Sequence, residues 1–131
     1  MKRVKDMVAA ANEVVEHAPA NDLLDQHGAD GVTFVDLRDP RELEREGMIP
    51  GAFHCPRGML EFWIDPESPY AKEQFQTGNK FVFYCASGWR SALSAQVAQE
   101  MGLENVSHIT DGFGGWKNAG GPVGEKPSKK G

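Results

Sequence analysis

Residues 81–101 join a buried strand to a helix through a very short turn. The run Phe81 to Tyr84 is aromatic and β-branched, which is typical of a parallel strand covered on both faces. Leu93 and Val97 lie four residues apart, as on one face of a helix, and Gly102 supplies a left-handed stop. This pattern predicts an α/β fold with Cys85 between the strand and the helix.

The turn itself has the composition of an anion-binding loop. Its backbone N–H groups and the positive end of the following helix are expected to surround the Cys85 sulfur. Gly88 allows an unusual backbone angle, two serines can donate hydroxyl hydrogen bonds, and Arg90 brings a forked positive charge. We therefore interpret Cys85 as a nucleophile. The expected substrate-binding residues are Ala86, Ser87, Gly88, Trp89, Arg90 and Ser91. The alternative is a cysteine that only packs in the core, because free cysteine is often buried.

Strands and helices alternate along the rest of the chain. Strands are expected at residues 32–37 and 52–55, and helices at residues 4–15, from 19 through 24, at 39–46 and in the segment ending at Phe75. Residues 57–70 are expected to form a longer connection. The alternation predicts a three-layer α/β/α domain with a mostly parallel sheet.

Domain organisation follows from length and local pattern. The 131 residues, 40% of them hydrophobic, suit one domain without a disulfide scaffold. Residues 1–18 are predicted to carry an amphipathic helix packed on a domain at 19–123, although its apolar stripe also suits a partner or dimer contact. Residues 124–131, rich in glycine and lysine, are predicted to be a flexible tail.

Composition excludes several classes of protein and site. A net charge of −5 argues against a nucleic-acid surface, and no apolar run reaches the length of a membrane span. Two cysteines and no secretory leader favour a reducing, cytoplasmic setting. The four histidines have no metal-ligand spacing, so neither a metal nor a cofactor is expected.

Several polar residues are expected to have structural roles. Asp39 and Glu42 are placed to cap the helix that begins at Pro40. Arg38 and Glu42 can pair across the same corner, and Asp36 is expected to hydrogen-bond nearby backbone. His54 and His108 are interpreted as structural histidines that can also approach a substrate.

Three further side chains leave two interpretations open. Cys55 can pack in the core or resolve an oxidised Cys85, which requires Cα atoms within about 7 Å. Trp63 and Trp89 can wall a pocket that keeps water from the sulfur, or can belong to the core.

Four segments in this order resemble the rhodanese family of sulfurtransferases, in particular its small single-domain bacterial members. They are Val32 to Arg38, a strand ending in Asp-x-Arg; Gly47 to Ala52; Cys85 to Ser91, a Cys-x4-Arg-Ser loop; and Asp111 to Trp116. Met48, at a position where that family often has histidine, and the shifted pair Gly114–Gly115 depart from its pattern. The resemblance implies a sheet of about five strands.

The resemblance also implies a function. In this family the loop cysteine takes a sulfane sulfur from a donor such as thiosulfate, becomes a persulfide, and passes the sulfur to cyanide or a thiol. Cys85 is the expected sulfur carrier, with Arg90 closing the loop and Ser91 opening the helix. The alternatives are a sulfur carrier that delivers to a protein partner and, more distantly, a phosphatase or arsenate reductase. Related phosphatases have a loop one residue longer, so the resemblance favours sulfur. The oligomeric state stays open.

Overall fold

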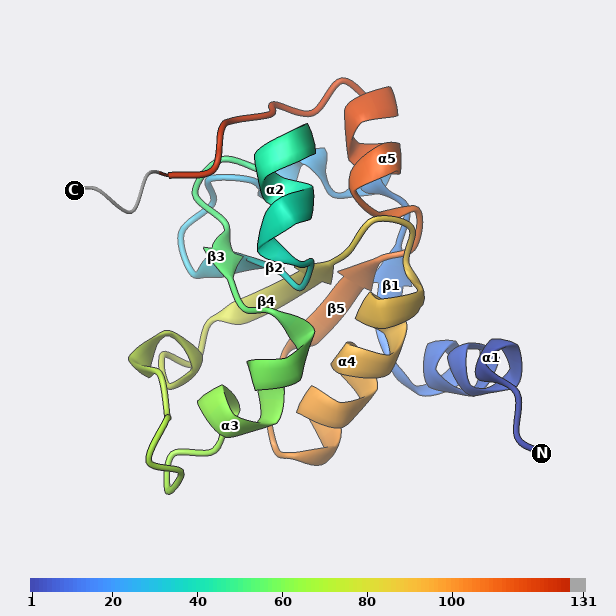
Figure 1. Ribbon diagram of the computed structural model, residues 1–131, viewed down its shortest axis with the longest axis vertical. Helices are drawn as coiled ribbons and strands as arrows, with labels where there is room; N and C mark the ends of the chain where they lie inside the picture. Colours follow the sequence, from blue (N-terminus) through green and yellow to red (C-terminus); the bar gives the residue numbers. More distant parts are fainter. Residues whose placement is uncertain (128–131) are drawn as a thin grey trace.

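The computed structural model describes residues 1–127, which fold around a five-stranded parallel sheet (Figure 1). The strand order is β1-β5-β4-β2-β3, and every neighbouring pair is parallel. The strands are β1 (Glu16–Ala18), β2 (Val32–Asp36), β3 (Phe53–His54), β4 (Lys80–Tyr84) and β5 (Val106–Ile109). The predicted α/β class and parallel sheet are therefore confirmed.

Helices cover both faces of the sheet, which gives the three expected layers. In Figure 1, α3 and α4 lie on one side of the sheet, and α2 and α5 lie on the other. The α-helices are α1 (Val4–Val14), α2 (Pro40–Glu46), α3 (Leu60–Ile64), α4 (Trp89–Glu100) and α5 (Gly112–Asn118).

The central strand β4 shows how the sequence divides the core between the two faces. Successive side chains of a strand point to opposite faces. Phe81 and Phe83 accordingly join the cluster under α3 and α4, whereas Val82 and Tyr84 join the cluster that contains Trp116 of α5. All four residues are buried, which explains why the segment is a continuous apolar run.

Small residues rather than large ones form the inner face of α4. Ala95 and Ala98 are fully buried against the sheet, while Leu93 and Val97 are only partly buried. Alanine lets the helix approach the strands closely. Leu93 instead contacts the apolar face of α1, which packs on α4.

The N-terminal segment differs from the expectation in one respect. Residues 4–14 form α1, with Val8 and Ala11 buried, but residues 16–18 form the edge strand β1 rather than the end of a helix. β1 pairs with β5, so the segment assigned to an appended helix contributes a strand to the sheet. A strand of three residues has too short a pattern to detect in sequence.

Two connecting segments also differ from the expectation. The segment after Pro19 forms two short 3₁₀ turns, Ala20–Asp22 and Leu24–Gln26, instead of an α-helix. The connection predicted at residues 57–70 contains α3, and the helix predicted to end at Phe75 is a single 3₁₀ turn, Glu73–Phe75.

The beginning of the predicted flexible tail is held against the domain. Gly124 exchanges two backbone hydrogen bonds with Met48, of 2.8 and 2.9 Å, so the flexible-tail prediction is wrong at this residue. Gly47 makes the approach possible, because a Cβ at that position would lie 2.6 Å from the Gly124 carbonyl oxygen. Residues 125–127 line a cavity beside α2, and residues 128–131 fall outside the described residues.

Candidate active site

Cys85 lies at the carboxyl end of the central strand, where the fold changes direction. The chain leaves β2 towards β3 on one side and leaves β4 towards β5 on the other. Ligands of open α/β sheets bind at such a switch point, outside the carboxyl ends of the strands. The position of Cys85 is therefore that of a functional residue as well as of a strand end.

The sulfur of Cys85 has two hydrogen-bond partners in the loop and the helix that follows. The backbone N–H of Gly88 donates to Sγ over 3.2 Å, and the thiol donates to Ser91 Oγ over 3.7 Å. α4 begins at Trp89, so its positive end is directed at the same region. Within residues 1–127, a single loop amide donates to Sγ, rather than the expected ring of amides.

The candidate nucleophile is buried. Cys85 is only 1% exposed, whereas Ala86 and Ser87 are exposed and Trp89 is half exposed. Ala86, Ser87 and Trp89 form the solvent-facing rim of this short loop, and the sulfur lies below the surface. A substrate can reach Sγ only when residues around it move.

Helix α5 holds the loop from behind. Phe113 N–H donates to the Cys85 carbonyl over 2.8 Å, and Gly114 N–H donates to the Ala86 carbonyl over 3.3 Å. Gly112 must lack a side chain, because its φ is 60° and a Cβ would lie 2.7 Å from the Cys85 carbonyl oxygen. The glycines of the segment 111–116 thus fix the peptide orientation of the loop.

Arg90 has a different partner from the one expected. Its guanidinium donates two hydrogen bonds, of 2.9 and 3.0 Å, to the carboxylate of Glu42 on α2. These bonds hold the pKa of Glu42 below its usual range and raise that of Arg90, to which nearby Cys85 also contributes. Arg90 ties the loop to α2, and the carboxylate of Glu42 offsets its charge beside Cys85.

The expected pair of Arg38 and Glu42 is therefore wrong. Arg38 instead donates to both carboxylate oxygens of Asp36 over 3.0 and 2.8 Å, in a fully buried ion pair. Its guanidinium also lies 4.3 Å from the ring centre of Phe113. Asp36 and Glu42 keep their predicted local roles: Asp36 accepts from the Arg38 backbone, and Glu42 accepts from the Asp39 backbone in a capping box.

Ser91 connects Cys85 to a buried histidine. Ser91 Oγ lies 2.9 Å from His108 Nδ1, and His108 Nε2 lies 2.7 Å from Asn12 Oδ1 on α1. Burial, with a smaller contribution from the charge of His17, lowers the pKa of His108 to about 4. His108 is consequently neutral at pH 7.

The burial of His108 predicts a loss of stability in acid. The unfolded chain takes up a proton on this residue below pH ~6.5 and the folded chain only near pH 4, so unfolding is favoured as the pH falls. We expect this residue to remove roughly 3 kcal/mol of unfolding free energy between pH 6.5 and pH 4. Urea unfolding at stepped pH should give a shallower dependence for His108→Gln; equal slopes would contradict the assignment.

Cys55 cannot resolve an oxidised Cys85 in this fold. Asp36 of β2 is in register with both His54 and Tyr84, so the two cysteines follow strands that flank β2 on either side. Two strand spacings separate them by about 9.6 Å, beyond the reach of a disulfide. Burial raises the pKa of Cys55 to about 12, which makes it an unreactive core thiol.

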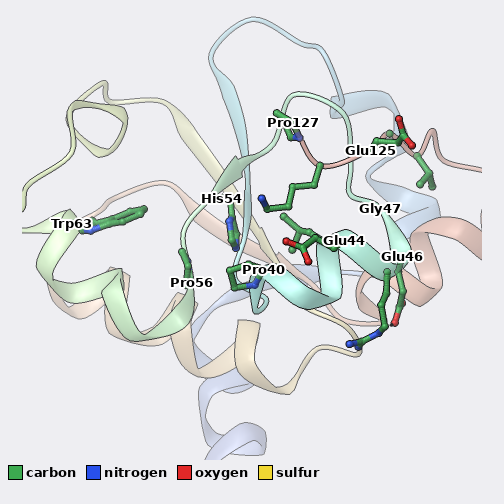
Figure 2. Close-up of a pocket in the computed structure, with 14 residues that line it drawn as sticks. Pro40, Glu44, Glu46, Gly47, His54, Pro56, Trp63, Glu125 and Pro127 are labelled. Atoms are coloured by element: carbon green, nitrogen blue, oxygen red, sulfur yellow. Dashed lines mark ion pairs between the residues drawn. The ribbon is translucent and has the colours of Figure 1, made fainter. Parts of the chain in front are cut away.

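One cavity lies away from the nucleophile. It has a volume of about 1090 Å³ and lies between α2, the β3–α3 segment and residues 123–127 (Figure 2). His54 and Trp63 line it, but none of residues 85–91 does. Trp63 therefore packs on Phe53 and the cavity rather than beside Cys85, and His54 bonds to the Arg38 carbonyl over 2.7 Å.

Neither a metal cluster nor a membrane span is found in the part of the chain that the structure describes. Across residues 1–127, histidine, cysteine and acidic side chains do not gather in groups of three or more that suit a metal ion. No described helix has both the length and the apolar character to cross a bilayer.

A family model for the rhodanese-like domain matches residues 19–119. The chain belongs to the rhodanese-like family. The matched residues contain β2 to β5, the Cys85 loop and α5, whereas β1 precedes them.

Individual relatives carry different functional names. A structure from Rhodopseudomonas palustris, of a protein of unknown function described as a possible tyrosine phosphatase, is 56% identical, with a TM-score of 0.92 over 95% of this chain and 96% of that one. Thiosulfate sulfurtransferase GlpE of Shewanella oneidensis is 29% identical over 79% of this chain and 94% of its own length. The dual specificity phosphatase Cdc25 of Arabidopsis thaliana is 25% identical over 83% of this chain and 77% of its own.

Two other curated relatives are longer than this chain. The chain spans 48% of an uncharacterized Synechocystis protein, at 33% identity, and 56% of a mouse protein named for its thiosulfate sulfurtransferase/rhodanese-like domain, at 25% identity. The chain therefore corresponds to about half the length of these two proteins.

Sequence reasoning missed three residues that contact the site or its partners. For Glu42 the sequence predicts a helix cap and a pair with Arg38 but not the pair with Arg90, and for His108 it does not predict the bond to Ser91. Asn12 was not considered, although it is a polar residue beside Ala11 on the apolar stripe of α1. A polar side chain inside an otherwise buried stripe was the available signal.

Proposed function

We propose that this chain is a sulfurtransferase that carries a sulfane sulfur on Cys85. The observation that carries the proposal is the contact of the Cys85 sulfur with the Gly88 amide, at the start of α4 and at the switch point of a rhodanese-like sheet. Membership of the family and the likeness to a thiosulfate sulfurtransferase support it.

The proposed cycle has two displacements at one sulfur atom. The Cys85 thiolate attacks the outer sulfur of a donor such as thiosulfate, the donor S–S bond breaks, and sulfite leaves with the electron pair. Cyanide or a thiolate then attacks the outer sulfur of the persulfide, and Cys85 leaves as thiolate. The Gly88 N–H and the helix end stabilise the negative sulfur in both steps.

Steady-state kinetics over a panel of sulfur donors and acceptors test this proposal. We expect parallel double-reciprocal lines, because the first product leaves before the acceptor binds. Loading without turnover on cyanide or small thiols would instead identify a carrier that delivers to a protein partner. The burial of Cys85 favours an acceptor that first displaces the rim.

A phosphatase is the second candidate, because two relatives carry phosphatase names. Phosphate chemistry needs a guanidinium that donates to the anion, whereas both terminal nitrogens of Arg90 donate to the carboxylate of Glu42. We therefore expect no aryl phosphate hydrolysis that depends on Cys85. Hydrolysis that is lost in Cys85→Ser would reverse the order of the two candidates.

Glu42→Gln is expected to lower the KM for thiosulfate about 2- to 5-fold, with kcat nearly unchanged. The substitution removes a negative charge that neutralises Arg90 beside the site, so a dianionic donor is attracted more strongly. Initial rates at low and high salt measure the effect, which should shrink with added salt.

Glu61→Gln is the matched control for this experiment. It removes the same charge from the Arg57–Glu61 ion pair, which has an equal distance of 2.9 Å but does not involve the loop. Its KM should stay at the wild-type value. An unchanged or higher KM in Glu42→Gln would show that Arg90 does not act on the donor.

A further inference from the structure

A line of hydrogen bonds runs from the N-terminal helix to the nucleophile. It passes from Asn12 to His108 over 2.7 Å, from His108 to Ser91 over 2.9 Å, and from Ser91 to Cys85 over 3.7 Å. His108 and Ser91 are fully buried, and Cys85 is nearly so. Three neighbouring polar side chains are thus isolated from water. Each must therefore find its hydrogen-bond partner in the next one along the line.

The directions of the bonds in this line follow from the orientation of the Asn12 amide. Asn12 presents its carbonyl oxygen, which can only accept, so His108 carries its proton on Nε2. Nδ1 of the neutral ring is then an acceptor, and at 2.9 Å it lies nearer to Ser91 Oγ than the Gly88 carbonyl oxygen, to which the same hydroxyl can donate over 3.2 Å. Ser91 consequently turns its lone pairs towards Cys85, and the sulfur donates as a thiol.

We propose that Ser91 and His108 form a proton relay that sets the protonation state of Cys85, and that Asn12 holds His108 in the required tautomer. At rest the relay keeps Cys85 protonated. On ionisation the thiol proton passes to Ser91 Oγ while the Ser91 proton passes to His108 Nδ1. The products are a thiolate and an imidazolium, and each of the three hydrogen bonds is retained. Ser91 touches the reacting sulfur, whereas His108 and Asn12 are positioning residues.

Two elements packed around the relay contribute a titratable or charged group. His17 of β1 lies 6.0 Å from the His108 ring, centre to centre, and its positive charge disfavours a second one. Arg90 of α4 is the cation beside Cys85, and its pairing with Glu42 limits how far it favours the thiolate. His108 is therefore a transient proton acceptor, which returns the proton when Cys85 leaves the persulfide.

The proton relay adds a protonation step to the proposed sulfur transfer and rests on that proposal. Its test, however, requires no sulfur donor. Asn12→Asp puts a negative charge on the far side of His108, which stabilises the imidazolium. If the relay operates, the thiolate:thiol ratio of Cys85 at pH 7 rises about 10-fold. If Asn12 is a bystander, the added negative charge leaves this ratio unchanged or lowers it. The two interpretations thus predict opposite signs.

Ultraviolet absorbance of the thiolate as a function of pH gives the ratio, with the Cys85→Ser form of each protein as reference. Cys55 does not interfere, because burial raises its pKa to about 12. Ala10→Asp is the matched control, since it adds the same charge to an exposed position of the same helix and should leave the titration unchanged. In Asn12→Asp combined with His108→Gln, the increase should vanish; its persistence would overturn the relay.

Nitrogen NMR of the unmodified protein provides a second measurement that requires no variant to fold. The relay predicts that at pH 7 His108 is protonated on Nε2 and not on Nδ1. The opposite tautomer would overturn the proposal. Sulfur loading from thiosulfate is measured separately, so a shifted titration without any loading contradicts the proposed function and leaves the relay intact.

Discussion

Cys85→Ser is expected to reduce sulfur transfer from thiosulfate to cyanide by at least ~10³-fold in kcat/KM. The serine oxygen cannot hold a sulfane sulfur, and its hydroxyl is a far weaker nucleophile than the thiol. The replacement is close in size and can still accept the Gly88 N–H, so the fold should persist. Thiocyanate formation measures the activity, and circular dichroism checks the fold.

Cys55→Ala is the control for thiol loss in general. Cys55 is buried and lies two strand spacings from Cys85, so its removal should lower stability while leaving kcat/KM within a few-fold. Substantial activity in Cys85→Ser, or its loss only in Cys55→Ala, would move the chemistry to another residue.

Gly88→Ala is expected to lower the free energy of unfolding by about 4 kcal/mol and to abolish sulfur loading. The φ of Gly88 is 120°, which L-residues rarely adopt, and a Cβ there would collide with the Thr110 carbonyl oxygen. Strain and overpacking each cost ~1–3 kcal/mol. Relieving them requires a shift of the amide that donates to Cys85.

Gly102→Ala separates these two causes. Gly102 follows the other end of α4 with a similar φ of 112°, yet a Cβ there meets nothing within 4 Å. We expect Gly102→Ala to lower the free energy of unfolding by the conformational cost alone, ~1–3 kcal/mol, and to leave sulfur loading of Cys85 normal. Urea unfolding and mass measurement after thiosulfate treatment compare the two variants. Equal stability losses, or normal loading in Gly88→Ala, would show that the contact with Thr110 does not constrain the loop.

Local patterns were sufficient to predict the elements that carry the site. The apolar run before Cys85 and the glycine and serines after it gave a strand, a turn and a helix start, which the structure has. The capping box of Asp39 and Glu42 was equally predictable, because its partners are three residues apart. Strand β1 was missed because three residues have no detectable period.

The surroundings of the sulfur depend on contacts between distant residues, and these could not be predicted from local patterns. Arg90 and Glu42 are 48 positions apart, and Asn12 and His108 are 96 apart. The burial of Cys85 could not be predicted either, because it depends on how α5 holds the loop. A motif identifies which residues are present, whereas packing decides which way each one faces.

The central proposal is that Sγ of Cys85 binds the transferred sulfane sulfur. Peptide mapping by mass spectrometry after thiosulfate treatment of the full chain tests it most directly. We predict one added sulfur atom, located on the peptide that contains Cys85, absent from the Cys55 peptide and removed by cyanide. An unmodified Cys85 after treatment with thiosulfate and with other sulfane donors, or an added sulfur on Cys55 alone, would contradict it.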